Sequence, residues 1–152
     1  MKTALMLAAA ALVVAGCATT PQTYNFDNSR SVDATFDRTW ESVISYFAEN
    51  NIPIATLEKD SGIIVAKNER YTPGAMKTFA DCASAFMMTN DVGQIDVNVF
   101  VRPVDDNTTS VQVNTSYSMR QSGAYGSSAV ETCNSNGTLE EALLDRIERD
   151  AV

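Results

Sequence analysis

This chain of 152 residues contains three cysteines and no histidine. Few of its residues are therefore of the types that most often act in catalysis. Histidine is the side chain that most often acts as a general base near neutral pH. Without it the chain has neither a Ser-His-Asp nor a Cys-His system to activate a nucleophile, and it has no zinc site with a histidine ligand. The residue types therefore argue against enzymes of these classes and make the cysteines the first groups to explain.

The acidic residues offer the remaining route to catalysis. Asp105 and Asp106 are adjacent in a polar stretch, so we interpret them as turn-forming residues. Asp81 is the only acid in an apolar run and stands next to Cys82, where we expect it to make a structural hydrogen bond. We therefore predict that the protein is not an enzyme and that it has no catalytic residue, no cofactor and no metal site.

The charge balance bears on the partners. The chain carries 11 Lys and Arg against 19 Asp and Glu, a net charge of -8 at pH 7. Affinity for nucleic acid depends on clustered basic residues, and here they are scattered along the chain, so we expect no nucleic-acid partner. A hydrophobic share of 45% instead indicates one domain with a modest packed core.

The first cysteine follows a short apolar segment. Residues 1–16 contain a single charge, Lys2, ahead of an apolar run too short to span a bilayer, which is the pattern of a secretory signal peptide. The run leads into a tetrapeptide, Val14-Ala15-Gly16-Cys17. This tetrapeptide resembles the lipobox of bacterial lipoprotein precursors. The resemblance implies that the chain is cleaved before Cys17 and that Cys17 is acylated, and two or more acyl chains anchor a protein stably on a bilayer.

The residue after Cys17 bears on the location. It is Ala18 rather than Asp, and in Gram-negative lipoproteins this resembles a sequence that is passed to the outer membrane. The resemblance implies a lipid-anchored protein that faces the periplasm. Cleavage leaves 136 residues with 10 basic and 19 acidic side chains, a net charge of -9. Anionic headgroups repel such a domain, so we expect it to contact the membrane through the lipid alone.

The other two cysteines are Cys82 and Cys133. They lie 51 positions apart without CxxC spacing, which disfavours a metal site. In an oxidising periplasm an even pair indicates a disulfide, and closing a loop of this length contributes on the order of 4 kcal/mol. The alternatives are a pair of buried thiols or a redox-active pair, although the latter usually needs close spacing.

Hydrophobic periodicity predicts a helix near each end of the folded part. Apolar residues recur every three or four positions from Phe36 to Asn50, and Thr35 is the expected N-cap. Residues 138–150 show the same pattern, and Thr138 with Glu141 predicts a capping box at its start.

Alternating apolar and polar residues predict strands between these helices. We expect one hairpin over residues 52–67 and a second, longer one over residues 95–119. Residues 69–93 are interpreted as a short helical turn at 73–79 followed by irregular or extended chain. The alternative for that stretch is a strand over residues 78–86.

Two segments are expected to be irregular. Residues 17–32 carry the lipid and are polar without periodicity, so we expect a lipidated N-terminus and flexible tether ahead of a single domain at 33–152. Residues 120–136 are rich in Gly and Ser, and loops of this length are usually functional or mobile. We therefore expect a candidate binding loop there, with Gln121 and Tyr125 as its contact residues.

The order of elements predicts an α+β fold, with an antiparallel β-sheet packed against an N-terminal and a C-terminal α-helix. The stretch Phe36 to Lys67 is similar to the opening of the helix-grip domains of outer-membrane assembly lipoproteins, the BamC-like family. There a Trp-bearing helix leads into a strand, an acidic turn ending in Gly, and a second strand. The resemblance implies a helix-grip-like fold.

These features favour a non-catalytic, lipid-anchored module that binds a protein partner at the periplasmic face of the outer membrane. The contact would use the groove between helix and sheet, or the loop at 120–136. The alternative is a binding module for a small apolar or lipid ligand in the same groove. Its cavity would be lined by one or more of four residues, Met76, Phe86, Met87 and Met88.

Mass spectrometry of the mature protein tests both cysteine assignments. We expect a chain that begins at Cys17 and carries acyl groups, and whose mass increases on reduction by the hydrogens that two thiols gain. A Cys17→Ser variant should lack acyl groups and fractionate with soluble periplasmic proteins. A mature chain that begins elsewhere, or that bears no lipid, would contradict the lipobox interpretation.

Overall fold

The computed structural model of the protein describes residues 20–83 and 87–152. Within these ranges the chain forms seven strands, all in one antiparallel sheet, and three α-helices. The architecture is therefore α+β, with helices on the N-terminal and C-terminal sides of the sheet, as the sequence predicts. The predictions for the signal peptide and for Cys17 lie outside the described residues.

The elements follow one another in an order close to the predicted one. In chain order they are β1 (Ser29–Val32), α1 (Phe36–Glu49), β2 (Ile54–Glu58), β3 (Ile63–Tyr71), α2 (Pro73–Met76), β4 (Ala80–Cys82), β5 (Met88–Pro103), β6 (Thr109–Gly123), a 3-10 turn (Ala124–Gly126), β7 (Ser128–Ser135) and α3 (Thr138–Ala151).

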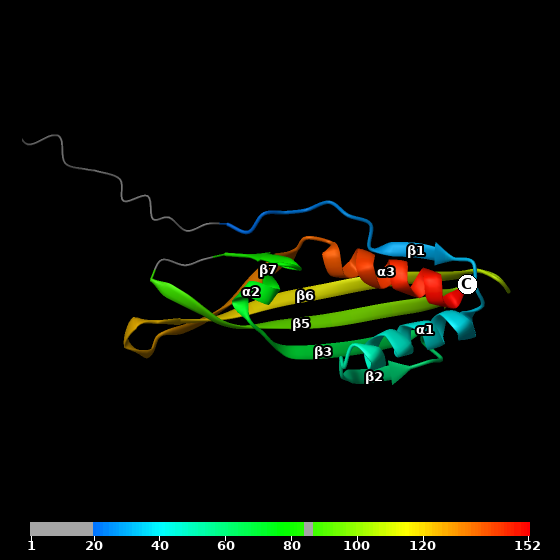
Figure 1. Ribbon diagram of the computed structural model, residues 1–152, viewed down its shortest axis with the longest axis horizontal. Helices are drawn as coiled ribbons and strands as arrows, with labels where there is room; N and C mark the ends of the chain where they lie inside the picture. The colour runs from blue at the N-terminus through cyan, green and yellow to red at the C-terminus, as the bar shows by residue number, and fades with distance from the viewer. Residues whose placement is uncertain (1–19, 84–86) are drawn as a thin grey trace, which may run out of the picture.

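Strands β5 and β6 form the centre of the sheet. They pair along their whole length, from Met88 opposite Gly123 to Pro103 opposite Thr109. The sheet order is β2-β3-β5-β6-β7-β4, and β1 also pairs with β6. Figure 1 shows the two long strands running along the molecule, with β1 near one end of β6 and β7 near the other.

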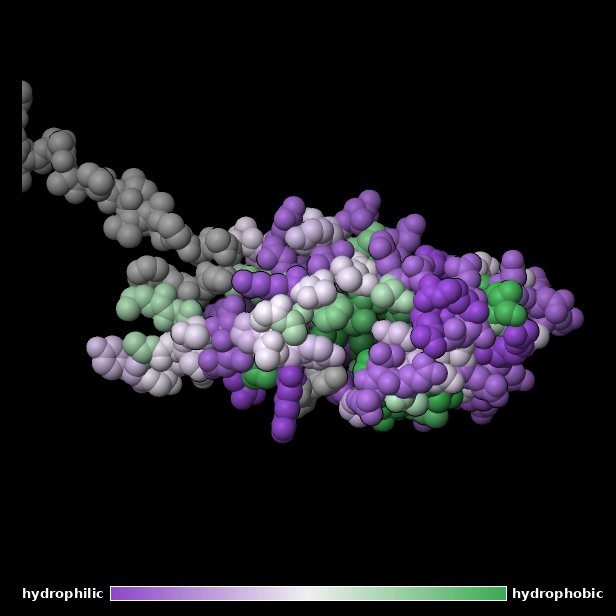
Figure 2. All heavy atoms as spheres, viewed as in Figure 1, coloured by the Kyte–Doolittle hydropathy of each residue, from purple (hydrophilic) through white to green (hydrophobic). Residues whose placement is uncertain are grey.

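Helices α1 and α3 lie side by side across one face of the sheet (Figure 1). Both are amphipathic, and Figure 2 shows polar residues over their outer side. The strands contribute every second side chain to the layer between helices and sheet. Core residues with no exposed surface are Val32, Val43, Phe47, Ile64, Ala66, Met76, Val99, Val101, Val111, Val113, Leu143, Ile147 and Ala151. Side chains therefore fill the space between the helices and the sheet.

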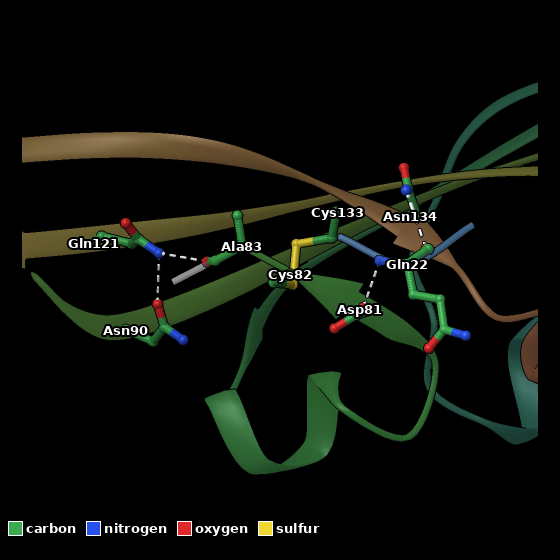
Figure 3. The surroundings of a disulfide bond; sticks show 8 residues. All are labelled: Gln22, Asp81, Cys82, Ala83, Asn90, Gln121, Cys133 and Asn134. Carbon is green, nitrogen blue, oxygen red and sulfur yellow. Dashed lines mark hydrogen bonds between the residues drawn. A yellow bond between two sulfur atoms is a disulfide. The ribbon is translucent and has the colours of Figure 1, made fainter. Parts of the chain in front are cut away.

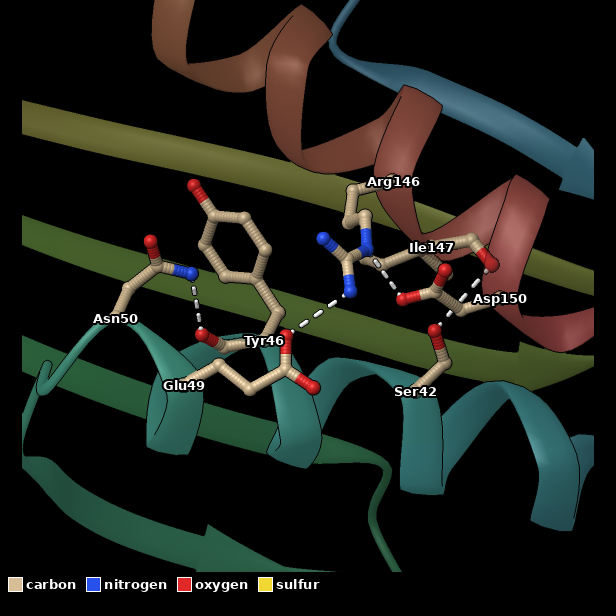
Figure 4. A network of polar contacts seen from close by, with 7 residues as sticks. All are labelled: Ser42, Tyr46, Glu49, Asn50, Arg146, Ile147 and Asp150. Atoms are coloured by element: carbon tan, nitrogen blue, oxygen red, sulfur yellow. Dashed lines mark hydrogen bonds and ion pairs between the residues drawn. The ribbon is translucent and has the colours of Figure 1, made fainter.

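One buried and one exposed polar contact join α1 to α3 (Figure 4). The Ser42 hydroxyl donates to the carbonyl oxygen of Ile147 at 3.3 Å. The Arg146 guanidinium reaches Glu49 of α1 at 2.9 Å and Asp150 of its own helix at 2.5 Å. Exposed ion pairs each contribute at most about 1 kcal/mol, so these contacts orient the helices while the apolar layer supplies most of the stability.

The predicted start of α1 is confirmed. Thr35 is the N-cap, and its side chain accepts a hydrogen bond from the backbone N–H of Arg38. The helix begins at Phe36 and ends at Glu49, one residue before the predicted end.

The predicted capping box of α3 is wrong. The N-cap is Gly137 rather than Thr138. Because glycine has no side chain that could cap the helix, no capping box with Glu141 forms. Gly137 has a φ of +86°, and a Cβ there would lie 2.6 Å from the ring of Phe26. The backbone N–H of Thr138 instead donates to the side-chain oxygen of Asn136 at 3.0 Å. The packing of the N-terminal segment onto the helix start therefore selects glycine at the cap.

The expected loop at 120–136 is a β-hairpin. β6 continues to Gly123, residues Ala124–Gly126 form a single 3-10 turn, and β7 returns from Ser128 to Ser135. The loop prediction is wrong because these Gly- and Ser-rich residues lack the regular alternation of apolar and polar side chains that marks a strand. Their extended conformation depends on backbone pairing with β6, which local sequence does not reveal.

The expected tether at 17–32 is structured over its second half. β1 pairs with β6, and just before β1 the carbonyl oxygen of Asn28 accepts a hydrogen bond from the N–H of Val113 at 2.8 Å. The folded domain therefore begins before residue 33. The prediction fails because β1 is a four-residue strand in which only Val32 is fully buried, so no apolar alternation marks it.

The segment at 69–93 combines the two readings left open by the sequence. The short helical turn predicted at 73–79 is present as α2, which spans four residues. Of the strand considered as the alternative at 78–86, Ala80–Cys82 form β4, and residues 84–86 lie outside the described residues. Both predicted hairpins are also present and are longer than expected, since β3 extends to Tyr71 and β5 begins at Met88.

Gly62 provides a test of this arrangement, because it turns the chain between β2 and β3. Its φ is +68°, and a Cβ there would lie 2.0 Å from the carbonyl oxygen of Val101. We expect Gly62→Ala to lower the free energy of unfolding by about 2–4 kcal/mol, because the left-handed backbone and the close approach of β5 both oppose a side chain.

The matched control is Gly74→Ala, since a Cβ at that position meets no described atom within 4 Å apart from its chain neighbours and the backbone of its own helix. Urea unfolding followed by circular dichroism should leave the control within about 1 kcal/mol of the native protein. Equal stabilities for the two variants would contradict the described turn.

Candidate interaction surface

A disulfide joins Cys82 of β4 to Cys133 of β7 (Figure 3). The two residues face each other directly in the antiparallel pair, with 4.2 Å between their Cα atoms. Beside it, Asp81 accepts a hydrogen bond from the backbone N–H of Gln22 at 2.6 Å, and the Asn134 side chain donates to the carbonyl oxygen of Gln22 at 3.1 Å. Asp81 thus makes a structural hydrogen bond, and this edge of the sheet holds the N-terminal segment.

A hollow of about 290 Å³ lies next to the disulfide, and residues from α2, β4 and the N-terminal segment contribute to its wall. Of the residues expected to line an apolar cavity, Met76 contributes to this wall, while Met87 is 72% exposed. Phe86 lies outside the described residues. Lys77 and Asp81 also line the hollow, and its volume is at the lower limit for small-molecule sites. These features do not favour an apolar ligand.

The two predicted loop residues have different environments. Gln121 is fully buried in β6, where its side-chain amide donates to the carbonyl oxygen of Ala83 at 3.0 Å and to the side-chain oxygen of Asn90 at 2.8 Å (Figure 3). It therefore braces the connection between β4 and β5 and is not accessible to a partner, which corrects its assignment as a contact residue. Tyr125 is fully exposed at the tip of the β6–β7 hairpin.

A polar cluster is buried beneath α3. Glu140 is 2% exposed, and its Oε1 accepts hydrogen bonds from the hydroxyls of Thr115 and Ser135. Its Oε2 and the hydroxyl of Tyr117 have no hydrogen-bond partner of normal geometry among the described residues. Burial raises the pKa of Tyr117 to about 12, and the charge of Glu140 adds to the effect. Because the cluster is closed to solvent, it can connect α3 to β6 and β7 but offers no access to a substrate.

The second face of the sheet is open, because α1, α2 and α3 all pack on the first face (Figure 1). Side chains that alternate with the core residues point to this open face. It presents Ile63, Val65 and Lys67 of β3, Gln94, Asp96, Asn98 and Phe100 of β5, Gln112, Asn114, Ser116, Ser118 and Arg120 of β6, and Val130 and Thr132 of β7. We refer to these residues as the open face.

One end of the open face is hollowed. The hollow has a volume of about 280 Å³, and Arg70, Gln94, Ser118, Arg120 and Val130 contribute to its wall. In the described part of the chain neither arginine forms an ion pair with a carboxylate, although acidic residues outnumber basic ones 19 to 11. Two guanidinium groups at one hollow suit a carboxylate, which arginine binds through paired N–H donors.

Neither arginine is among the residues that the sequence predicts for a contact. Arg120 continues the polar alternation of β6, so a longer prediction for that strand would have placed it on the solvated face. Arg70 could not be placed in this way. It lies at an irregularity of the β3–β5 register and has a φ of +138°, and such irregularities break the two-residue alternation on which the placement depends.

Comparison with known proteins does not assign this surface, since no protein-family model and no curated protein matches the chain. Across residues 20–83 and 87–152, no helix has the length and apolar character needed to cross a membrane. The same residues contain no group of three or more Cys, Asp or Glu side chains placed to hold a metal ion. The surface is therefore interpreted from its own residues.

The buried Tyr117 predicts a pH dependence of stability. An unfolded tyrosine loses its proton near pH 10, whereas folded Tyr117 retains it to about pH 12. The contribution of protonated Tyr117 to the free energy of unfolding is therefore complete below pH 10. As the pH rises to 12, up to about 2.7 kcal/mol of it is lost. Urea unfolding at pH 7, 10 and 11.5 should show this loss in the native protein.

Tyr117→Phe is the control for that measurement, because it retains the ring and removes the proton. Its stability at pH 7 should change by less than about 1 kcal/mol, since the hydroxyl has no well-formed hydrogen bond to lose. Above pH 10 it should become the more stable of the two proteins. Parallel pH curves for both would contradict the buried, protonated state of Tyr117.

Proposed function

We propose that this protein is a non-catalytic, lipid-anchored envelope lipoprotein that binds a protein partner at the periplasmic face of the outer membrane through its open face. The observation that carries the proposal is the uncovered face of the sheet, with its hollow between Arg70 and Arg120. The lipobox at Cys17 supports the anchor. The similarity of Phe36–Lys67 to BamC-like domains supports a helix-grip-like fold and a role in assembly.

The rest of the open face also has the chemistry of a contact surface. At the end away from the hollow, Ile63 pairs with Phe100 across β3 and β5, and both are only partly buried. The guanidinium of Arg102 lies 5.6 Å from the centre of the Phe100 ring. Aromatic residues and arginine are enriched in protein interfaces, where they often contribute much of the binding energy. A partner spanning the face would contact an apolar end and a basic end.

The charge of the protein defines the chemistry of that partner. A chain with a net charge of -8 repels acidic proteins at long range. An acidic segment can therefore bind only through close pairing, and the hollow offers this through Arg70 and Arg120. We assign to the hollow a carboxylate group of the partner, supplied by an acidic side chain or a C-terminus.

The open face replaces the two contact regions that the sequence suggested. Core side chains occupy the space between the helices and the sheet, so a protein segment or a small apolar ligand would have to displace them. The predicted loop is a paired hairpin in which Gln121 is buried. A partner can bind to the open face without displacing any core side chain.

Charge reversal tests the proposal in the full-length, acylated protein. We expect Arg70→Glu and Arg120→Glu each to reduce the recovery of a partner from detergent-solubilised envelopes at least about tenfold, which corresponds to a loss of about 1.4 kcal/mol. Quantitative mass spectrometry of affinity-purified material measures the recovery. Each variant replaces an attraction for a carboxylate by a repulsion.

Arg149→Glu is the matched control, since Arg149 is exposed in the last turn of α3 on the helical side and the charge change is the same. It should recover the partner at the native level. Equal recovery from all three variants, or equal loss in all three, would contradict binding through the open face.

A further inference from the structure

The distance between Cys17 and the folded domain is short. Gln22 is held at the sheet edge by Asp81 and Asn134, and the Asn134 side chain also lies 3.3 Å from the carbonyl oxygen of Pro21. Four residue steps separate Pro21 from Cys17, and an extended chain spans at most about 3.6 Å per residue, so the connection reaches about 14 Å. If Cys17 carries the lipid, as the proposed function requires, the disulfide end of the domain lies close to the bilayer.

Two turns project from that same end. The tip of the β6–β7 hairpin and the start of β5 lie at the end of the molecule where the N-terminal segment leaves it, and the β5–β6 turn lies at the other end (Figure 1). From Cys133 to Ser128, β7 runs five residues, or about 16 Å, toward the tip. The hairpin therefore extends about as far from the disulfide as the connection to Cys17 can reach.

These turns expose two large side chains, one apolar and one aromatic, beside small uncharged ones such as Thr89 and Ser127. Tyr125 is fully exposed, and Met87 is 72% exposed. Figure 2 shows the projecting end in pale and green tones, whereas the opposite end is mostly deep purple. A folded domain has no internal use for an exposed tyrosine and an exposed methionine at the same end, whereas tyrosine is enriched at the interface between membrane and water.

Charge distinguishes this end from the rest of the protein. Residues 87–90 and 121–130 contain no charged side chain, in a chain of which 20% is charged and which has a net charge of -8. Charged residues return at Asp91 and Glu131. Anionic headgroups repel acidic surfaces, and the uncharged turns present no acid to them.

The backbone holds these side chains outward in a costly conformation. Met87 and Tyr125 have φ angles of +62° and +60°, a region that non-glycine residues seldom adopt and that persists only where the surrounding structure holds it. The two turns are also fixed to each other, because the buried Gln121 donates hydrogen bonds to Ala83 and Asn90. They therefore form one preorganised surface.

We infer that the exposed side chains at 87–89 and 122–128 form a surface that rests on the bilayer holding the Cys17 lipid, with the side chains of Tyr125 and Met87 among the headgroups. The inference rests on the proposed anchor and extends it. It also replaces the expectation that the membrane contact runs through the lipid alone. The protein then contacts the membrane at two points, the Cys17 lipid and this surface. The sheet stands away from the membrane, and the open face stays accessible to a partner.

A fluorescent probe on the full-length, acylated protein tests the inference. Ser128→Cys places a free thiol near the tip and leaves Tyr125 intact, and Val104→Cys places one in the β5–β6 turn, where Val104 is 63% exposed. Both are labelled with a polarity-sensitive dye and reconstituted into protein-free vesicles of phosphatidylethanolamine and phosphatidylglycerol. We expect a blue shift and quenching by brominated lipid for the probe at 128, and neither for the probe at 104.

Substitutions in the turns complete the test. Adding Met87→Asp and Tyr125→Asp to the Ser128→Cys protein should abolish the blue shift, while the protein still floats with the vesicles through its lipid. A probe at 128 that reports water in an acylated, floating protein overturns this inference and leaves the anchor in place. Absence of both acylation and flotation overturns the proposed anchor itself. A shift seen only when envelope proteins are added would assign the turns to a protein partner and would also overturn the inference.

Discussion

The pairing of β5 with β6 is the constraint on which the rest of the structure depends. The two strands are hydrogen-bonded from Met88 opposite Gly123 to Pro103 opposite Thr109, and along this length one face is apolar and the other polar. The apolar face can leave water only if both long helices pack on the same side. The open polar face follows directly, because no other helix of the described chain remains to cover it.

The length of β6 also determines which strands can pair along its other edge. β1 pairs with its first residues and β7 with its last, so the N-terminal segment and the C-terminal hairpin share one strand. The disulfide then joins β7 to β4, and the Asp81 and Asn134 side chains beside it hold Gln22. A segment that would otherwise be a free tether becomes part of the domain, and this brings the disulfide end close to the residue proposed to carry the lipid.

The chemistry of the protein is consistent with binding. The buried Glu140 and Tyr117 are enclosed by α3, β6 and β7, so they contribute to the core. On the open face, the exposed side chains of Arg70 and Arg120 share a hollow. Only part of this site could be predicted. Arg120 follows the alternation of its strand, whereas the position of Arg70 depends on a register irregularity that no residue pattern encodes.

The sequence by itself determined the features that have a local physical signal. Helical periodicity located α1 and α3, apolar alternation located the centres of β5 and β6, and their order indicated an α+β fold. Tertiary structure alone decided the features that depend on distant backbone pairing. Residues 29–32 and 128–135 are strands because β6 offers them hydrogen bonds. Gln121 is buried while Tyr125 is exposed because strand β6 ends between them. The hydrogen-bond partner that specifies each of these segments lies elsewhere in the chain, so no local pattern can identify it.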